Sequence, residues 1–449
     1  MTDPHRETGK GGPDARPWVS DGESRATSPY VALGALLAVY VLSSMDRQLV
    51  AILAESIKHD LDLSDGELGL LSGTAFAFFY VVAGIPLSWL ADRVNRVRVV
   101  ALSCLAWSAM TAATGLAGTF AHLALLRMGV GIGEAGGTAP SFSLLSDFFP
   151  PARRARANAV FSFGTPLGVM LGTTLAGVIA AEHGWRAAFV VAGALGLIVA
   201  PLLLFIREPV RGRFAKGPAG PAMPAKEVLA LFRRPVIFLL TLNTGISAFA
   251  GWVLLAWTPA FLMRLRDMSL GEIGLWYSPV IGIALALGGF AGGMIADRYA
   301  TRDRRIYAVL PAVANLVSIP LVIIALQSDS WQVALPFLAL PSLLTILYLA
   351  PSLALLHELV PPSGRTLATA ILILVLNVFG IGCGPLVIGA LSDAFTPAYG
   401  ERGLEMALYV LVPVMLVAVL AYGALAVAIG REDRRNLTLQ DIGRDPDAR

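Results

Sequence analysis

The chain has 449 residues, of which 56% are hydrophobic and 14% charged, and its formal net charge is +3. A soluble domain carries about 25% charged residues, so a mean hydropathy of +0.70 excludes a water-soluble fold and makes lipid the solvent. The two cysteines, Cys104 and Cys383, lie inside apolar runs and predict neither a disulfide nor a metal site.

Residues 1–28 are polar, with neither apolar periodicity nor the short apolar core of a signal peptide, and we expect a disordered tail there. Twelve hydrophobic runs follow, each close to the roughly 20 residues that span a bilayer. Their length predicts helices rather than the strands of a barrel. The runs cover residues 30–57, 68–90, 98–117, 120–147, 155–181, 186–206, 235–263, 272–296, 305–327, 332–357, 364–392 and 404–430.

Basic residues gather after the even-numbered runs and are sparse in the other connectors. The positive-inside rule therefore places both termini in the cytoplasm, as in a multi-pass protein of a bacterial-type inner (plasma) membrane. The residues that carry this bias are Arg93, Arg96, Arg98, Arg153, Arg154, Arg156, Arg207, Arg211, Arg213, Lys216, Lys226, Arg233, Arg234, Arg298, Arg302, Arg304, Arg305, Arg365, Arg431, Arg434 and Arg435.

The chain divides into two halves with similar sequence landmarks. We expect six-helix bundles over 29–206 and 235–430, a cytoplasmic linker with a short amphipathic helix over 207–234, and a cytoplasmic tail over 431–449. An Asp-Arg pair closes the second and eighth runs, and an acid before Pro-Pro closes the fourth and tenth. Because both motifs recur after nearly the same number of residues, the two halves are predicted to be parallel repeats. We expect a binding site at their interface near the bilayer midplane.

Six plus six spans with an Asp-Arg motif after the second and eighth resemble the major facilitator superfamily. The family pattern has glycines where this chain has Ser88 and Asn95. The resemblance implies an all-α integral membrane fold of two pseudo-symmetric six-helix bundles that alternate access to a central site. It also implies a cytoplasmic gate, the alternative being ordinary interfacial charges. The expected gate residues are Asp92, Arg93, Arg96, Asp147, Asp297, Arg298 and Glu358, with Asp147 and Glu358 as partners of the arginines.

Four motifs of the first half are similar to the Spinster family of lipid transporters. They are Ser44-Met45-Asp46-Arg47, Asp92-Arg93-Val94-Asn95-Arg96, the run from Arg127 to Glu134, and the run from Gly184 to Phe189. The likeness covers residues 40–190 and is weaker afterwards. It implies proton coupling and an amphiphilic anionic lipid substrate, such as a lysophospholipid or a sphingoid phosphate.

Four charged residues, Asp46, Arg47, Arg127 and Glu134, lie inside the first and fourth runs. Each costs about 2.5–3.5 kcal/mol at a helix centre on insertion scales, and such residues usually mark function. A helix rises about 1.5 Å per residue, and this rise places the four residues at similar depths in the bilayer. Their side chains can therefore form one network whose charges sum to zero. A static cluster is the alternative, but a buried ion pair rarely stabilises more than apolar packing would.

A proton-driven switch explains this network better. Adjacent Asp46 and Arg47 point in different directions, so we expect Arg47 to meet Glu134 while Asp46 faces the cavity. Burial favours a protonated carboxyl group and a neighbouring arginine favours the carboxylate. Asp46 and Glu134 are the predicted proton carriers, Arg47 the gate, and Arg127 an anion-binding or partner charge.

The remaining predictions concern the cavity and its content. Phe76, Phe79, Tyr80, Asn243, Trp252, Tyr348 and Asn377 are candidate cavity residues, with packing as the alternative for each. The absence of a phosphate-binding glycine loop argues against ATP-driven transport. We expect a monomer without enzymatic activity, cofactor, metal or nucleic-acid partner. An organic-anion or sugar-acid transporter and a drug:proton antiporter remain alternatives, and a channel is the rival class.

Overall fold

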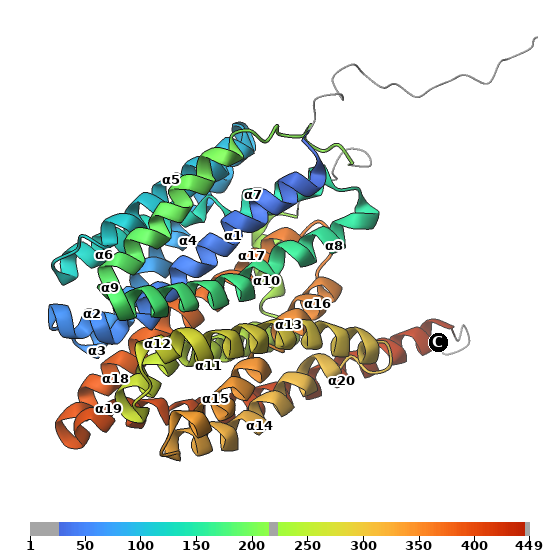
Figure 1. The fold of residues 1–449 in the computed structure, drawn as a ribbon. Coiled ribbons are helices and arrows are strands. Elements are labelled where there is room, and N and C mark those ends of the chain that lie inside the picture. Colours follow the sequence, from blue (N-terminus) through green and yellow to red (C-terminus); the bar gives the residue numbers. More distant parts are fainter. Residues whose placement is uncertain (1–26, 215–222, 445–449) are drawn as a thin grey trace, which may run out of the picture.

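The computed structural model describes residues 27–214 and 223–444, with side chains to residue 435. Every regular element in this part of the chain is helical (Figure 1). Most of the tail expected to be disordered, residues 1–26, lies outside the described residues.

The first bundle runs from residue 29 to residue 203. Its elements are α1 (Pro29–Ile52), α2 (Ala54–Leu61), α3 (Asp65–Gly69), η2 (Leu70–Thr74), α4 (Ala75–Arg93), α5 (Arg96–Thr114), α6 (Phe120–Ala135), α7 (Thr138–Phe148), α8 (Pro151–Ser162) and α9 (Gly164–Leu203). The connector that follows contains the short helix α10 (Ala225–Leu231), where the sequence predicts an amphipathic helix.

The second bundle begins at residue 235. Its elements are α11 (Pro235–Arg266), α12 (Leu270–Glu272), η3 (Ile273–Tyr277), α13 (Ser278–Ala300), α14 (Ile306–Gln327), α15 (Trp331–Thr345), α16 (Leu349–Leu359), α17 (Arg365–Leu376), η4 (Asn377–Cys383), α18 (Gly384–Tyr399), η5 (Gly400–Arg402), α19 (Gly403–Leu408) and α20 (Leu411–Arg444). The two bundles lie side by side (Figure 1).

Nine helical stretches of the described chain are long and apolar enough to cross a membrane. The stretch Pro151–Leu203 contains a non-helical residue, Gly184 with φ 79°, and therefore holds two spans. The stretch Arg365–Arg435 turns back at Gly400, with φ 61°, and also holds two. A further span, α6–α7, is interrupted between Ala135 and Thr138, so that neither part alone is long enough to cross. The helices thus agree with the twelve spans expected from the sequence.

The starts of α3 and α12 show how closely the halves match. Ser64 and Glu67 form a capping box at α3, and Ser269 and Glu272 form the same box at α12. Each box satisfies backbone N–H groups that a helix start leaves unpaired. A π-helical turn follows in both places, η2 and η3. Local sequence thus sets the same start for the second span of each half.

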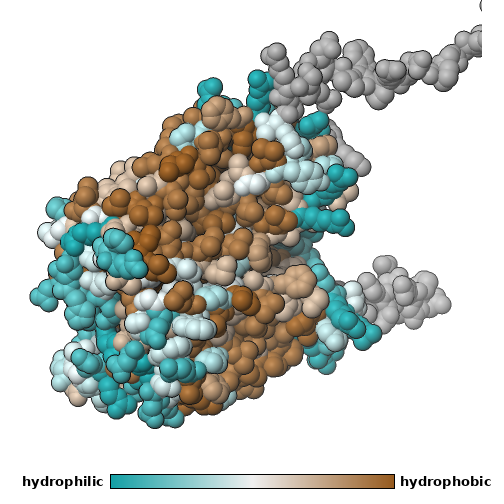
Figure 2. All heavy atoms as spheres, in the orientation of Figure 1, coloured by the Kyte–Doolittle hydropathy of each residue, from teal (hydrophilic) through white to brown (hydrophobic). Residues whose placement is uncertain are grey.

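The bundles meet tightly at one end and separate at the other. Small residues allow the close approach: a Cβ on Gly177 would lie 2.7 Å from Gly274 Cα, and one on Gly69 would lie 2.4 Å from Pro385 O. We call this end, where α2, α3, α18 and α19 lie, the closed end. The other, where α4 ends and α8 begins, is the basic end, and the space-filling view is hollowed there between the bundles (Figure 2).

Candidate functional site: a central cavity and two buried ion pairs

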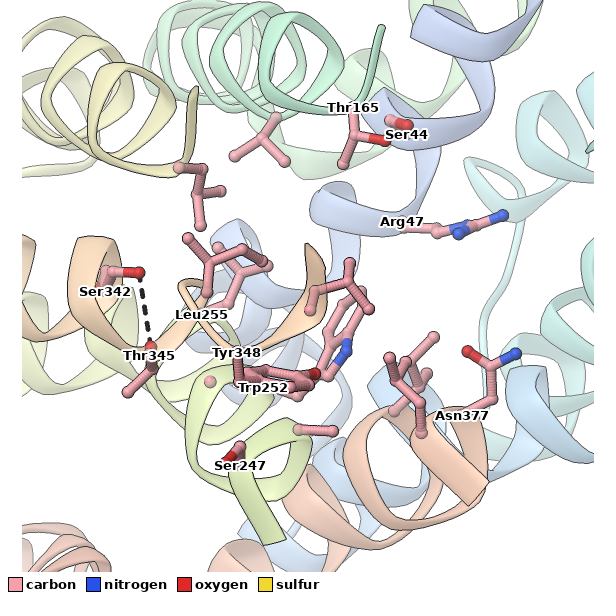
Figure 3. A pocket seen from close by; sticks show the side chains of 18 of the residues that line it. Ser44, Arg47, Thr165, Ser247, Trp252, Leu255, Ser342, Thr345, Tyr348 and Asn377 are labelled. Atoms are coloured by element: carbon pink, nitrogen blue, oxygen red, sulfur yellow. Dashed lines mark hydrogen bonds between the residues drawn. The ribbon is translucent and has the colours of Figure 1, made fainter. Parts of the chain in front are cut away.

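A cavity of about 250 Å³ lies between the bundles. The first bundle contributes side chains from α1 and α9, and the second contributes the others (Figure 3). Arg47 is the one charged side chain among the described residues that line it. The lining residues are Tyr40, Ser44, Arg47, Gln48, Thr165, Val169, Ser247, Ala248, Gly251, Trp252, Leu255, Leu285, Ser342, Thr345, Ile346, Tyr348, Leu349, Leu376, Asn377 and Ile381.

The helical repeat of α1 explains its polar contribution to the cavity. Ser44 lies four residues from Tyr40, three from Arg47 and four from Gln48, so these side chains lie on one side of the helix. Across the cavity, α11 presents Trp252 near Tyr348 (Figure 3). The result is one cationic group facing hydroxyl, amide and aromatic side chains, with aliphatic residues between them.

Arg47 forms an ion pair with Glu134 of α6 at the edge of the cavity. Its Nε and Nη2 lie 2.8 Å and 2.7 Å from Glu134 Oε2. Ser43 Oγ donates to the same oxygen at 2.6 Å. The Glu134 side chain is fully buried, whereas 18% of the Arg47 side chain is exposed. Arg47 therefore connects the cavity with a carboxyl group that the cavity itself does not reach.

Asp46 and Arg127 form a second ion pair between α1 and α6. Arg127 Nη1 lies 3.0 Å from Asp46 Oδ2, and Thr111 Oγ1 donates to Asp46 Oδ1 at 2.5 Å. Both charged side chains are buried, at 2% and 4% exposed. Our expectation that Asp46 faces the cavity is wrong, because α1 turns its next residue, Arg47, toward the second bundle. Arg127 does not line the cavity either.

Phe76 connects the two pairs. The Arg47 and Arg127 guanidinium carbons lie 5.3 Å and 5.5 Å from the centre of its ring, within cation–π range. Tyr80 stacks on Phe76 and lies 5.3 Å from Arg47. The four charges therefore form two pairs that share an aromatic contact, rather than one set of mutual ion pairs.

The structure divides the candidate cavity residues. Trp252, Tyr348 and Asn377 line the cavity. Four others do not. Phe76 is buried beneath the arginines, Tyr80 stacks beside it, Phe79 packs edge-on against Phe78, and Asn243 is fully buried and donates to Leu239 O on its own helix. Packing within one bundle explains these four.

Sequence reasoning missed the small polar lining residues. Ser44 and Gln48 on α1 and Ser247 on α11 reach the cavity, as do Ser342 and Thr345 on α15. A signal was present for α1, because Ser44, Arg47 and Gln48 recur at helical spacing in an otherwise apolar run. The other hydroxyls show no such pattern, since serine and threonine also bond to their own helix.

The predicted gate residues lie at the basic end. The side chains of Asp92, Arg93, Asp297 and Arg298 are exposed there. Arg93 stays on its own helix, 3.7 Å from the Trp89 ring centre.

The two expected partner acids also bind within their own bundles. Arg96 is buried and pairs with Asp147 at 2.7 Å. Glu358 pairs with Arg304 at 3.0 Å, and not with Arg298 as expected, because Arg304 lies in the connector that faces α16.

At the closed end, polar contacts join the bundles. Arg264 of α11 pairs with Glu55 at 2.6 Å and with Asp65 at 2.8 Å, both from the first bundle. Asp393 of α18 accepts hydrogen bonds from the backbone N–H groups of Asp65, at 2.9 Å, and Gly66, at 2.7 Å. Two helical bundles closed at one end and open at the other, around a cavity at their interface, define a membrane transporter.

Comparison with known proteins places this transporter in a family. The Major Facilitator Superfamily profile matches residues 36–348, and the chain belongs to that superfamily. An MFS-type efflux pump of Mycolicibacterium smegmatis is 38% identical over 88% of this chain and 91% of its own. Protein spinster homolog 1 of Xenopus tropicalis is 28% identical over 89% of this chain and 81% of its own.

A solved structure gives the same result. A bacterial homolog of the human lysosomal transporter Spinster, in an inward-facing and unoccupied conformation, superposes with a TM-score of 0.81. It is 29% identical and covers 90% of this chain and 98% of its own. The resemblance to the Spinster family and the two-bundle fold are both confirmed.

Proposed function

We propose that this protein is a proton-coupled secondary transporter that moves an anionic amphiphile by alternating access. The observation that carries the proposal is the Arg47–Glu134 pair, because it joins the cationic group of the cavity to a buried acid. Protonation of Glu134 would remove its negative charge and leave Arg47 available to a substrate anion. Coupling requires only that this exchange of partners accompany the motion of the bundles.

The charges around the cavity favour an anion over a cation. Arg47 lines the cavity, while Asp46 and Glu134 are buried against other partners. A cationic drug would meet the arginine without an acid to balance its charge, which argues against the drug:proton alternative. Trp252, Leu255 and the aliphatic residues around them offer an apolar wall to an acyl chain.

The relatives support this proposal without fixing the substrate. The resemblance to the Spinster family implies a lipid with an anionic head, and the relative described as an MFS-type efflux pump favours movement out of the cell. The positive-inside rule places the basic end in the cytoplasm, so the open cavity would load from that side. A small organic anion, such as a sugar acid, is the second candidate, because it needs Arg47 but not the apolar wall.

Two probes separate these candidates on the purified chain. A ligand that binds the folded state stabilises it by mass action, so thermal unfolding is followed with lysophosphatidylglycerol below its micellar concentration and with glucuronate. We expect stabilisation by the lysolipid, lost in the double variant Arg47→Gln/Glu134→Gln, which removes the pair without leaving one charge buried. Mass spectrometry of what co-purifies gives independent identification. Stabilisation by glucuronate alone would favour the organic-anion function.

The coupling is tested in proteoliposomes with whichever probe binds. Glu134→Gln mimics the protonated acid, so probe exchange at equal pH should continue while uptake or efflux driven by a pH gradient is lost. Glu272→Gln, at an exposed capping box on α12, is the matched control. Proton-driven flux that is unchanged in both Glu134→Gln and Asp46→Asn would refute the coupling.

A further inference from the structure

The two oxygens of Glu134 have different surroundings. Oε2 accepts bonds from Ser43 and Arg47. Oε1 is buried and has no hydrogen-bond partner among the described residues. A buried carboxylate oxygen without a partner is costly, and it is also where a proton can be added without breaking an existing bond. Asp46 differs, because Thr111 and Arg127 satisfy its two oxygens separately.

A small chamber, distinct from the substrate cavity, is lined by Glu134. Its volume of about 10 Å³ is near the minimum for one water molecule. It lies where the fourth span is interrupted, between α6 and α7. The chamber is lined by Val39, Tyr40, Ser43, Trp107, Glu134, Gly137, Thr138, Ser141 and Phe161. Hydroxyl groups from α1 and α7 thus surround a space that fits a single water.

We propose that this chamber is a water site through which Glu134 exchanges its proton, separate from the cavity that binds substrate. The inference rests on the proposed proton coupling. A hydronium ion in the chamber transfers one proton to Oε1: an O–H bond forms on Glu134 as one breaks on the ion, and water remains. The reverse step releases the proton. Proton and anion then reach the Arg47–Glu134 pair from two separate spaces, the chamber beside Glu134 and the cavity beside Arg47.

Tyr40 forms the wall between the two spaces, because it lines both the substrate cavity and the chamber. Its ring stacks on Phe161 at 4.6 Å, which holds it in place. Trp107 lines both this chamber and a second void of about 10 Å³ beside Asp46. The proton site therefore has rigid aromatic boundaries, with Thr138 and Ser141 of α7 leading toward the basic end.

Several ionisable groups surround Glu134 and share its electrostatic field. Arg47, Asp46 and Tyr40 lie near it on α1, and Arg127 lies on its own helix. Tyr80 of α4 contacts its partner Arg47, and Cys104 lies on α5. None of the substitutions proposed below removes one of these groups. A change in proton exchange in those variants would therefore come from the chamber and not from a changed charge.

Infrared spectroscopy of the full-length protein tests the proposal without a substrate. The carboxylic-acid band of Glu134 is assigned by its loss in Glu134→Gln, and its appearance is timed after a pH jump. Thr138→Val removes a chamber hydroxyl at constant shape. We expect it to slow protonation by about tenfold or more, since a positioned proton-transfer group contributes roughly 10²–10⁴-fold. Thr138→Ser, which keeps the hydroxyl, should restore the rate.

Thr244→Val is the matched control, because it makes the same substitution at a buried threonine of the second bundle, whose hydroxyl bonds to Leu240 O within α11. It should leave the protonation rate at the wild-type value. A band that forms equally fast in wild type and in Thr138→Val would overturn the chamber while leaving proton coupling intact. If no carboxylic-acid band of the wild type is lost in Glu134→Gln, Glu134 does not titrate, and both the chamber and the coupling would be overturned.

Discussion

The closed end and the basic end of the molecule use the same kinds of charged residues in opposite ways. At the closed end, Arg264 and Asp393 of the second bundle bind groups of the first. At the basic end, the ion pairs of Arg96 and Arg304 stay within single bundles, and Asp92 and Asp297 are exposed. This difference identifies the conformational state: an end is closed where the ion pairs join the two bundles, and open where each ion pair forms within one bundle. Polar bonds between bundles hold one end shut, and the hollow lies at the other (Figure 2).

The Arg264 contact is more important for specifying this state than for overall stability. A buried ion pair seldom stabilises more than an apolar replacement would, but removal of one partner costs about 3–5 kcal/mol. Arg264 faces two acids, and Lys58 also reaches Asp65, at 2.5 Å. Opening the closed end must break these contacts and expose both acids to water, where their charges are solvated.

The largest expected effect comes from Arg264→Met. Glu55 and Asp65 would then be buried together without their shared cation, so the closed end should open and the outward-open population should increase. Double electron–electron resonance measures the distance between spin labels at His59 and Glu401, and this distance should become longer. These labels are placed in a background without Cys104 and Cys383.

Arg186→Met is the control for that prediction. Arg186 lies at the same end and pairs with Asp60 at 2.6 Å, but both side chains are 42% exposed and both belong to the first bundle. An exposed pair contributes about 0–1 kcal/mol, so the distances should not change. Equal distributions in Arg264→Met and wild type would contradict a clasp at the closed end.

A smaller effect is expected from Asp92→Asn at the basic end. The exposed carboxylate contributes little to stability in the present state, so the free energy of unfolding should change by no more than about 0.5 kcal/mol. If Asp92 closes the basic end in the other state, its loss should raise the inward-open population. Labels at Arg153 and Arg302 report this, with Asp303→Asn as an exposed control; an unchanged distribution would argue against a gate.

The sequence predicts the helices well because a bilayer accepts few alternatives. Hydrophobic length, the Gly184-Trp185 junction and the repeated Asp-Arg motif place the spans, and buried charges point to the first and fourth of them. The direction in which each side chain points is not predicted in this way. Asp46 and Arg47 are neighbours in the sequence, and only the packing of α1 against α9 and α11 decides which of them lines the cavity. The same holds for Phe76, whose aromatic ring packs beneath arginines instead of lining the cavity.

The gate shows a similar limit. The sequence identifies Asp147 and Glu358 as acids beside arginines, and Arg96–Asp147 forms as expected. Glu358 instead meets Arg304, since the connector after α13 places that residue nearer than Arg298. Arg264 was absent from the predicted site because its partners, Glu55 and Asp65, come from the other half of the chain. Contacts between halves depend on the conformational state, which local sequence does not specify.

The most direct test of the account compares both ends of the molecule as pH changes. Distances across the basic end, from Arg153 to Arg302, and across the closed end, from His59 to Glu401, are measured in liposomes by electron–electron resonance. We predict that acidification changes the two distances in opposite directions in the wild type, and that Glu134→Gln keeps one distance distribution at every pH. A pH response that is the same in Glu134→Gln as in the wild type would contradict the central role of the Arg47–Glu134 pair.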